Sequence, residues 1–203
     1  MPRDGAPTRE RILSVAERLV IENGFSATPV ERVIAESGTS KGAFFHHFDS
    51  KVALARALVD RYVAADLGHL DRALATAQAE HDDPVERVIA FVRLFEEEAD
   101  ALMAEQSSCL YLAVLTERQL ADVGTAEQIA AAVVGWRDAV AAMIREAYAA
   151  LESAPTIDPA ALADHLFVTF EGAFLLCRST GDPTHMRRQL RVLRELVESL
   201  LRR

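Results

Sequence analysis

Hydrophobic residues recur at spacings of three and four along most of the chain, with polar or charged residues between them. This period is typical of amphipathic α-helices. Alternating runs of β-branched residues, which would indicate strands, are absent from the sequence, while alanine, leucine, glutamate and arginine are abundant. The pattern predicts an all-α protein of about nine helices.

The first predicted helix runs from about Thr8, which can cap it, to Asn23, and Gly24 ends it. The second opens at Thr28 with the capping-box pattern, since glutamate follows three residues later, and proline occupies the first helical position. It ends near Gly38, where the chain turns.

Ser40 is expected to cap a short third helix from Lys41 to about Phe48, and Asp49 or Ser50 to cap a fourth. Two short helices joined by a turn and braced by a preceding helix form a helix-turn-helix, which lays its second helix in the major groove of DNA. Residues 8–61 are therefore predicted to be a three-helix DNA-binding domain.

Residues 62–203 are predicted to form a second domain, a C-terminal helical bundle. The polar stretch 75–84 indicates a link, and the Asp-Pro pairs at 83–84 and 158–159 are typical helix starts. Helices are expected from there to about Leu102, within 108–117, over 125–151, over 158–178, and from Thr184 nearly to the C-terminus.

Charge is distributed unevenly along the chain. The net charge is -9, yet residues 1–61 hold nine Lys and Arg against eight Asp and Glu, and the remainder holds thirteen against twenty-three. The acidity belongs to the C-terminal region, so the N-terminal region can bind phosphate if its cations share one face.

The only two lysines, Lys41 and Lys51, both lie in the predicted helix-turn-helix region. Lys41 can reach a guanine edge or a phosphate, and Lys51 adds its charge to the positive end of the fourth helix. On a helical wheel, one side of the third helix carries the phenylalanines that anchor it, and the other side carries Gly42, Ala43, His46 and His47. Gly42 lets the DNA come close, and the methyl of Ala43 can touch a thymine methyl.

The stretch TPVERVIAESGTSKGAFFHHFDSKVAL at 28–54 resembles the helix-turn-helix of the tetracycline-repressor-like (TetR) family of bacterial transcription regulators. The matching positions are Val33, Gly38, Ser40, Lys41, Gly42, Phe44, His47, Phe48, Ser50, Lys51 and Leu54. Phe45 stands where the family usually has a tyrosine that binds phosphate, and it can still contact sugar or a thymine methyl. The predicted DNA contacts are Thr28, Ser40, Lys41, Gly42, Ala43, Phe45, His46, His47 and Lys51.

The resemblance implies that the last two helices pair with those of a second copy in a four-helix interface. The residues expected in that interface are Leu162, Leu166, Gly172, Leu190, Leu193, Val197 and Leu200. The alternative interpretation is that these apolar stripes close the core of a single chain.

The resemblance also implies a small-molecule cavity in the C-terminal domain. Its candidate lining residues are Phe91, Phe95, Cys109, Tyr111, Trp136, Met143, Phe170, Glu171 and Phe174. The alternative for the apolar members is ordinary core packing. Glu171 either meets a cationic ligand or faces solvent or an arginine.

Other sites are not expected. Cys109 and Cys177 are far apart in the sequence, which fits buried thiols in a reducing compartment. Adjacent helical histidines point about 100° apart and cannot chelate one ion, so we expect neither metal nor cofactor. The N-terminus lacks an apolar signal region, and no apolar run reaches the length of a membrane span. A cytoplasmic protein without a membrane partner is predicted.

The sequence therefore predicts a homodimeric DNA-binding regulator, most often a repressor in this family, released from its operator by a small molecule. No nucleophile–base pair or glycine-rich phosphate loop indicates an enzyme. Two alternatives stay open: a helical small-molecule-binding protein, and a dimerising adaptor without specific DNA binding.

Overall fold

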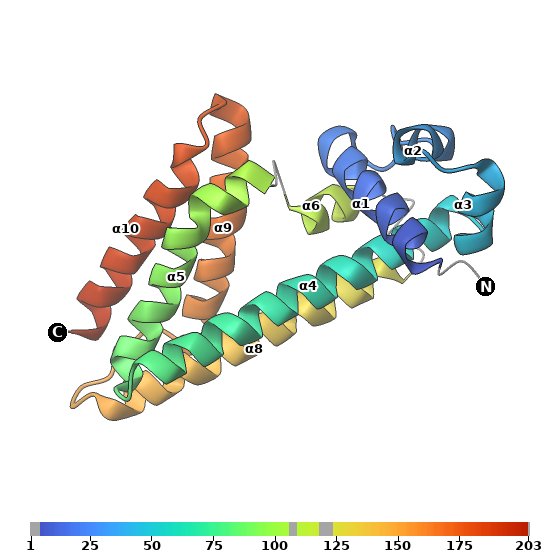
Figure 1. The fold of residues 1–203 in the computed structure, drawn as a ribbon. Helices are drawn as coiled ribbons and strands as arrows, with labels where there is room; N and C mark the ends of the chain where they lie inside the picture. Colours follow the sequence, from blue (N-terminus) through green and yellow to red (C-terminus); the bar gives the residue numbers. More distant parts are fainter. Residues whose placement is uncertain (1–4, 106–108, 118–123, 203) are drawn as a thin grey trace. The chain divides into compact units, whose positions relative to one another are not determined.

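The computed structural model describes residues 5–105, 109–117 and 124–202, and these ranges contain helices and no strands. Figure 1 shows them as a ribbon. The nine helices of these ranges are α1 (Ala6–Asn23), α2 (Val30–Ser37), α3 (Lys41–His47), α4 (Lys51–Glu80), α5 (Pro84–Glu105), α6 (Leu110–Leu115), α8 (Thr125–Ala150), α9 (Pro159–Thr180) and α10 (Thr184–Leu201). The predicted all-α class, with about nine helices, is confirmed.

Two helix bounds differ from those predicted. α1 begins at Ala6 rather than at Thr8, with Gly5 as its N-terminal cap residue. The predicted link at 75–84 is helical as far as Glu80, at the end of α4. Alanine has the highest helix propensity, so an alanine-rich polar segment extends a helix readily.

The chain divides into two compact units. The N-terminal unit comprises Met1–Ala65 and Ser108–Ala131, and the C-terminal unit comprises Asp66–Ser107 and Ala132–Arg203. Both α4 and α8 pass from one unit into the other. The predicted boundary at residue 62 lies within α4, and segment 108–131, which was expected in the C-terminal domain, belongs to the N-terminal unit.

The core of the N-terminal unit is the apolar face of α1 together with aromatic anchors from α3. Ile12, Ala16 and Leu19 of α1 are buried, and so are Phe44 of α3 and Phe48, which directly follows it. Their rings lie 5.7 Å apart. Burying a phenylalanine side chain stabilises a fold by about 1.5–3 kcal/mol, so these two rings fix α3 against the rest of the unit.

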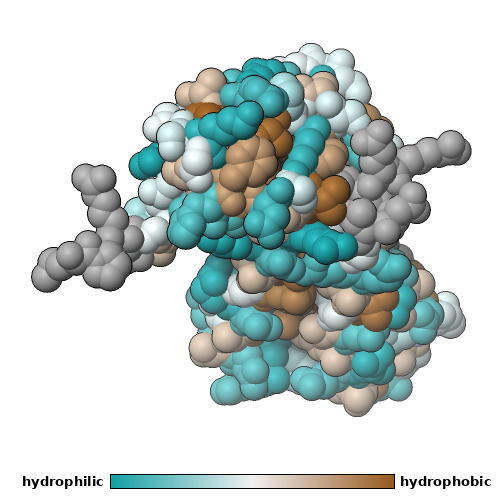
Figure 2. Space-filling model, turned by 90° about the vertical axis from the view of Figure 1, so that its right-hand side faces the viewer, coloured by the Kyte–Doolittle hydropathy of each residue, from teal (hydrophilic) through white to brown (hydrophobic). Residues whose placement is uncertain are grey.

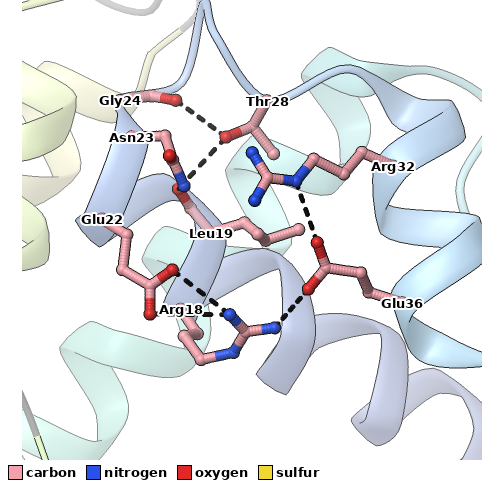
Figure 3. A network of polar contacts seen from close by, with 8 residues as sticks. All are labelled: Arg18, Leu19, Glu22, Asn23, Gly24, Thr28, Arg32 and Glu36. Carbon is pink, nitrogen blue, oxygen red and sulfur yellow. Dashed lines mark hydrogen bonds and ion pairs between the residues drawn. The ribbon is translucent and has the colours of Figure 1, made fainter.

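The turn between α1 and α2 corrects the capping prediction (Figure 3). The Thr28 hydroxyl donates to the carbonyl oxygens of Leu19 at 3.2 Å and Gly24 at 2.8 Å, and the residue is only 2% exposed. The N-terminal cap residue of α2 is Pro29, which offers no side-chain hydrogen bond. The predicted capping box is therefore wrong: the Thr28 hydroxyl bonds carbonyls at the end of α1 instead of the backbone at the start of α2.

Ion pairs join the exposed sides of α1 and α2 (Figure 3). Arg18 contacts Glu22 at 3.2 Å within α1 and Glu36 of α2 at 2.5 Å, and Arg32 contacts Glu36 at 2.9 Å. The hydrogen bonds from Arg18 and Arg32 lower the pKa of Glu36. Each exposed pair contributes little stability, so these contacts add to the packing of α2 on α1 and do not determine it.

In the C-terminal unit, α10 packs against α5 and α9. The carboxylate of Glu96 on α5 is buried and accepts hydrogen bonds from Arg191 at 2.9 Å and Arg194 at 2.7 Å. Arg202 adds a bond to Glu86 at 2.8 Å. These contacts clamp one face of α10 onto α5.

Burial corrects the predicted dimer residues. Five of the seven are buried within the single chain: Leu162, Leu166, Leu190, Leu193 and Val197. Leu200 is half-buried and Gly172 is exposed. The most regular apolar stripe of an amphipathic helix faces a hydrophobic core. In α9 and α10 that stripe faces the core of the single chain, so it is not available to a second copy. The apolar residues left exposed on α9 and α10 are Val168, Leu175, Leu176, Val192 and Leu196.

Helix α9 is also long and apolar enough to cross a membrane by length and composition, with a mean hydropathy of 1.5. The apolar runs of α9 are interrupted by Asp164, Glu171 and Arg178, so none of them alone indicates a membrane span. Buried helices of water-soluble proteins pass the same test, and Leu162, Leu166 and Phe174 of α9 pack inside the C-terminal unit. The finding is therefore weak evidence for a membrane span.

Candidate nucleic-acid interface

The helix-turn-helix is built by a glycine turn and a serine cap. Gly38 adopts φ 62°, in the left-handed region that glycine favours, and its N–H donates to Ala35 O at 3.2 Å. Ser40 then accepts a hydrogen bond from Ala43 N at 3.1 Å. The predicted cap at Ser40 is present, and α3 begins at Lys41 as expected.

One side of α3 is open to solvent. Lys41, Gly42, Phe45 and His46 are exposed, whereas Ala43 and His47 are half-buried. Phe45 is 42% exposed although it is apolar. Figure 2 looks onto the side where α2 and α3 lie in Figure 1, and hydrophobic surface lies there among hydrophilic residues. The side of α3 opposite its anchors is thus available for an external partner.

Neither the backbone conformation nor the packing around Gly42 requires a glycine at this position. Its φ is not positive, and a Cβ built on it would meet only Ser40 Oγ, at 4.0 Å. Glycine inside a helix costs about 1 kcal/mol relative to alanine. The missing side chain therefore fits a surface that something outside the chain approaches closely.

Two predicted DNA contacts have internal roles. Thr28 is buried by its hydrogen bonds to the end of α1, so its side chain cannot reach DNA. The Lys51 ammonium donates to Phe25 O at 2.6 Å and lies 4.3 Å from the centre of the Phe25 ring. Burial lowers the pKa of Lys51, although the charge of Glu117 opposes this. A phosphate contact by Lys51 stays a prediction, beside a structural role that the sequence did not indicate.

A distant segment supports the same turn. Glu117, just after α6, accepts hydrogen bonds from Ser26 N at 3.1 Å and from Ser26 Oγ at 2.5 Å. These bonds lower the pKa of Glu117. The contact joins residues 91 positions apart, which no sequence spacing could have predicted.

The predicted pocket residues divide between the two units. Cys109 and Tyr111 belong to the N-terminal unit, where Tyr62 lies beside both, with its hydroxyl 3.7 Å from Cys109 Sγ. Phe91, Phe95, Trp136 and Phe170 gather in the C-terminal unit. Met143 and Phe174 are buried in that unit and Glu171 is half-buried.

Sequence reasoning missed two members of this aromatic group. The Phe167 ring lies 6.4 Å from that of Trp136, and the His69 ring lies 5.1 Å from that of Phe95. Phe167 precedes Phe170 by three residues on α9, and that helical spacing was the available signal. His69 comes from α4 and carried none. The ring contacts link five phenylalanine and tryptophan residues, Phe91, Phe95, Trp136, Phe167 and Phe170, which we call the aromatic cluster.

Within the residues that the structure describes, no group of three or more histidine, cysteine or acidic side chains is placed to hold a metal ion. His46 and His47 lie side by side, with ring centres 5.2 Å apart. Both histidines lie at the end of α3, next to the exposed side described above, and their rings are in edge-on contact.

Individual relatives resemble the chain over most of its length. The transcriptional regulator AcuR of Cereibacter sphaeroides is 28% identical over 198 residues, covering 91% of this chain and 87% of AcuR. The crystal structure of a TetR transcriptional regulator from Chloroflexus aurantiacus is 27% identical with a TM-score of 0.79, covering 98% of each chain. A regulator from Saccharomonospora viridis, solved in complex with choline, is 26% identical with a TM-score of 0.71, covering 94% of this chain and 96% of that one.

Family models account for both regions of the sequence. Residues 12–58 match the model described as bacterial regulatory proteins of the tetR family. Residues 84–193, more than half of the chain, match the tetracyclin repressor-like C-terminal domain. With a capped and exposed α3 in place, these matches identify the chain as a member of the TetR family of DNA-binding transcriptional regulators.

Proposed function

We propose that this protein is a transcriptional repressor that binds operator DNA as a homodimer and is released by a small molecule. The observation that carries the proposal is the exposed side of α3, with Lys41, Gly42 and Phe45 open beside a helix start capped by Ser40. In this arrangement α3 enters the major groove. The contacts proposed are Ser40, Lys41, Gly42, Ala43, Phe45, His46 and His47, with Lys51 as a further phosphate contact.

Dimerisation supplies the specificity that one short helix lacks. A single α3 reads few bases, and two half-sites about one helical turn apart provide the rest. The exposed apolar residues of α9 and α10 support a second copy as the partner, since Val168, Leu175 and Leu196 are each 58–61% exposed. Gly172 lies among them, and a Cβ there would meet nothing within 4 Å in its own chain, which leaves room for a close helix–helix approach.

Release follows from a shift between two conformations. A ligand that binds the C-terminal unit more tightly in the DNA-free conformation must weaken DNA binding by the same factor by which DNA weakens ligand binding. A 100-fold loss of DNA affinity requires about 2.7 kcal/mol of differential ligand binding. Because α4 and α8 each belong to both units, either helix can carry the change. The choline-bound Saccharomonospora viridis regulator supports a small-molecule effector.

This role suits a non-catalytic protein of the bacterial cytoplasm, where the chromosome is accessible. Fluorescence anisotropy with DNA from upstream of the protein's own coding sequence tests the proposal. Nanomolar binding that weakens steeply with salt is expected. Ala43→Glu should abolish this binding and leave the dimer intact, because it places a carboxylate on the groove-facing side of α3. Affinity no better than for random DNA would contradict the proposal.

A further inference from the structure

The aromatic cluster of the C-terminal unit has Phe95 at its centre. The Phe95 ring lies 5.0 Å from that of Phe91, 5.2 Å from that of Phe170 and 5.1 Å from that of His69. The Trp136 ring lies 6.2 Å from that of Phe95. Rings from α4, α5, α8 and α9 thus converge on one place. The distances in sequence between these helices do not reveal this convergence.

The cluster has a buried side and an accessible side. Phe91 and Trp136 are buried, whereas Phe95, Phe167 and Phe170 keep part of their surface exposed. Three adjacent phenylalanines that only filled a core would be expected to lose nearly all of that surface. The accessible rings therefore offer an apolar contact surface to a ligand.

The chemistry of the accessible rings favours a positive charge. The face of an aromatic ring carries negative partial charge and attracts cations, especially where water is excluded. A cluster of such rings binds an ammonium group with an apolar body better than a neutral molecule of the same shape.

The net charge of the C-terminal unit also favours a cationic ligand. The unit holds twelve Lys and Arg against twenty Asp and Glu, so its field repels anions. Glu171 on α9 is half-buried, with Oε2 shielded from solvent, and lies one helical turn from Phe167.

We propose that the aromatic cluster binds a small organic cation with an apolar body, of the quaternary ammonium class, with Glu171 supplying a negative charge. This proposal rests on the proposed function in one respect, because it gives the chemical class of the effector. Binding itself is independent of DNA and is measured without it.

Trp136 is the only tryptophan of the chain, so its fluorescence reports directly on the cluster. We would titrate the full-length protein with choline and with 3,3-dimethylbutan-1-ol, the neutral isostere of choline. The expected result is a saturable change in emission with choline and an apparent affinity at least tenfold lower for the isostere. Equal affinities, or no saturable change with choline, would overturn the proposal.

Three substitutions locate the effect. Glu171→Gln keeps shape and removes charge, and Phe95→Leu keeps apolar bulk and removes the ring; each should weaken choline binding at least fivefold. Glu97→Gln removes the same charge from an exposed position of α5 and should leave binding unchanged. If Glu97→Gln weakens binding as much as Glu171→Gln, the carboxylate assignment is wrong. Should Phe95→Leu fail to fold, the comparison of choline with its isostere on the unaltered protein decides the matter.

Anisotropy with operator DNA separates this proposal from the proposed function. If choline binds at Trp136 and operator affinity stays the same, the ligand class stands and the effector role fails. If a different, uncharged compound releases the DNA while choline leaves Trp136 unchanged, the regulator stands and the cation proposal fails.

Discussion

Gly42 lacks a side chain because, in the proposed function, DNA approaches it closely. The fold itself does not require a glycine there. Alanine fits its position, because a Cβ would make only an ordinary contact with Ser40 Oγ, at 4.0 Å, and the backbone is helical. We expect Gly42→Ala to leave the melting temperature unchanged or to raise it, with a gain of up to about 1 kcal/mol in unfolding free energy. Operator affinity should nevertheless fall about tenfold, since the new methyl occupies the space of close approach.

Thermal unfolding and anisotropy on the same preparation check this opposition. The matched control is Gly135→Ala, also helical and open but on α8, which should leave operator affinity unchanged. If Gly42→Ala binds operator DNA as well as the unaltered protein, the close approach of α3 is refuted.

Lys41 should act as a DNA contact alone, whereas Lys51 should combine its proposed phosphate contact with a structural role. Lys41 is exposed, so Lys41→Ala should keep stability and lower the slope of log affinity against log salt by about 0.9, the value of one phosphate contact. Lys51→Ala removes a hydrogen bond and a cation–π contact to Phe25, and should cost about 1–2 kcal/mol of unfolding free energy. Urea unfolding and salt titrations measure both. A reduced salt slope in Lys51→Ala at unchanged stability would assign Lys51 to phosphate alone, and an unchanged slope with lost stability would assign it to the fold alone.

At the scale of the element, the clamp between α5 and α10 should make stability depend on pH. Burial raises the pKa of Glu96, but hydrogen bonds from Arg194 and Arg191 outweigh it and leave the pKa below its usual range. A carboxylate with a depressed folded-state pKa contributes stability above its unfolded value, near 4.3, and this contribution is lost as pH falls through the folded value.

We therefore expect Glu96→Gln to cost about 2 kcal/mol at pH 7, because it leaves two arginine hydrogen bonds without a charged acceptor. The variant should also lose less unfolding free energy than the unaltered protein between pH 7 and pH 3. Urea unfolding across this range checks the slope, with the exposed Glu97→Gln as control. If the unfolding free energies of Glu96→Gln and of the unaltered protein change with pH in parallel, the Glu96 clamp does not contribute to the pH dependence of stability.

Helices and their ends were predictable where the signal is local. Ser40, Ser50 and Asp158 each accept the capping hydrogen bond expected of them. Thr28 was misassigned because two helix ends compete for one hydroxyl, and burial of that hydroxyl decides between them. A turn that depends on Glu117 from a remote segment lies beyond any local pattern.

The site was predictable only in part, for the same reason. The composition of α3 shows which of its sides carries anchors and which is free, since 3.6 residues complete a turn. The aromatic cluster joins three helices, and His69 contacts it from a fourth. No sequence spacing encodes how these helices are arranged, so Phe167 and His69 were missed. Hydrophobic periodicity likewise marks a covered stripe without indicating which copy of the chain covers it.

For the whole molecule, the remaining question is which surface joins two copies. Val168, Leu175 and Leu196 are the most exposed of the large apolar residues that the structure describes. Placing a charge on such a surface should disrupt association without unfolding the chain, because these exposed side chains contribute little to the core of their own chain. We expect Leu175→Glu with Leu196→Glu to convert the dimer to a folded monomer, as measured by sedimentation equilibrium and circular dichroism.

Loss of the dimer should weaken binding to a complete operator at least 100-fold, since the second half-site is then no longer held at high effective concentration. Binding to an isolated half-site should be unaffected. The control is Ile157→Glu, an exposed apolar residue in the loop before α9, which should leave both association and operator affinity unchanged. A doubly substituted chain that still sediments as a dimer would assign the interface to another surface, for which the exposed Val134 of α8 is the next candidate.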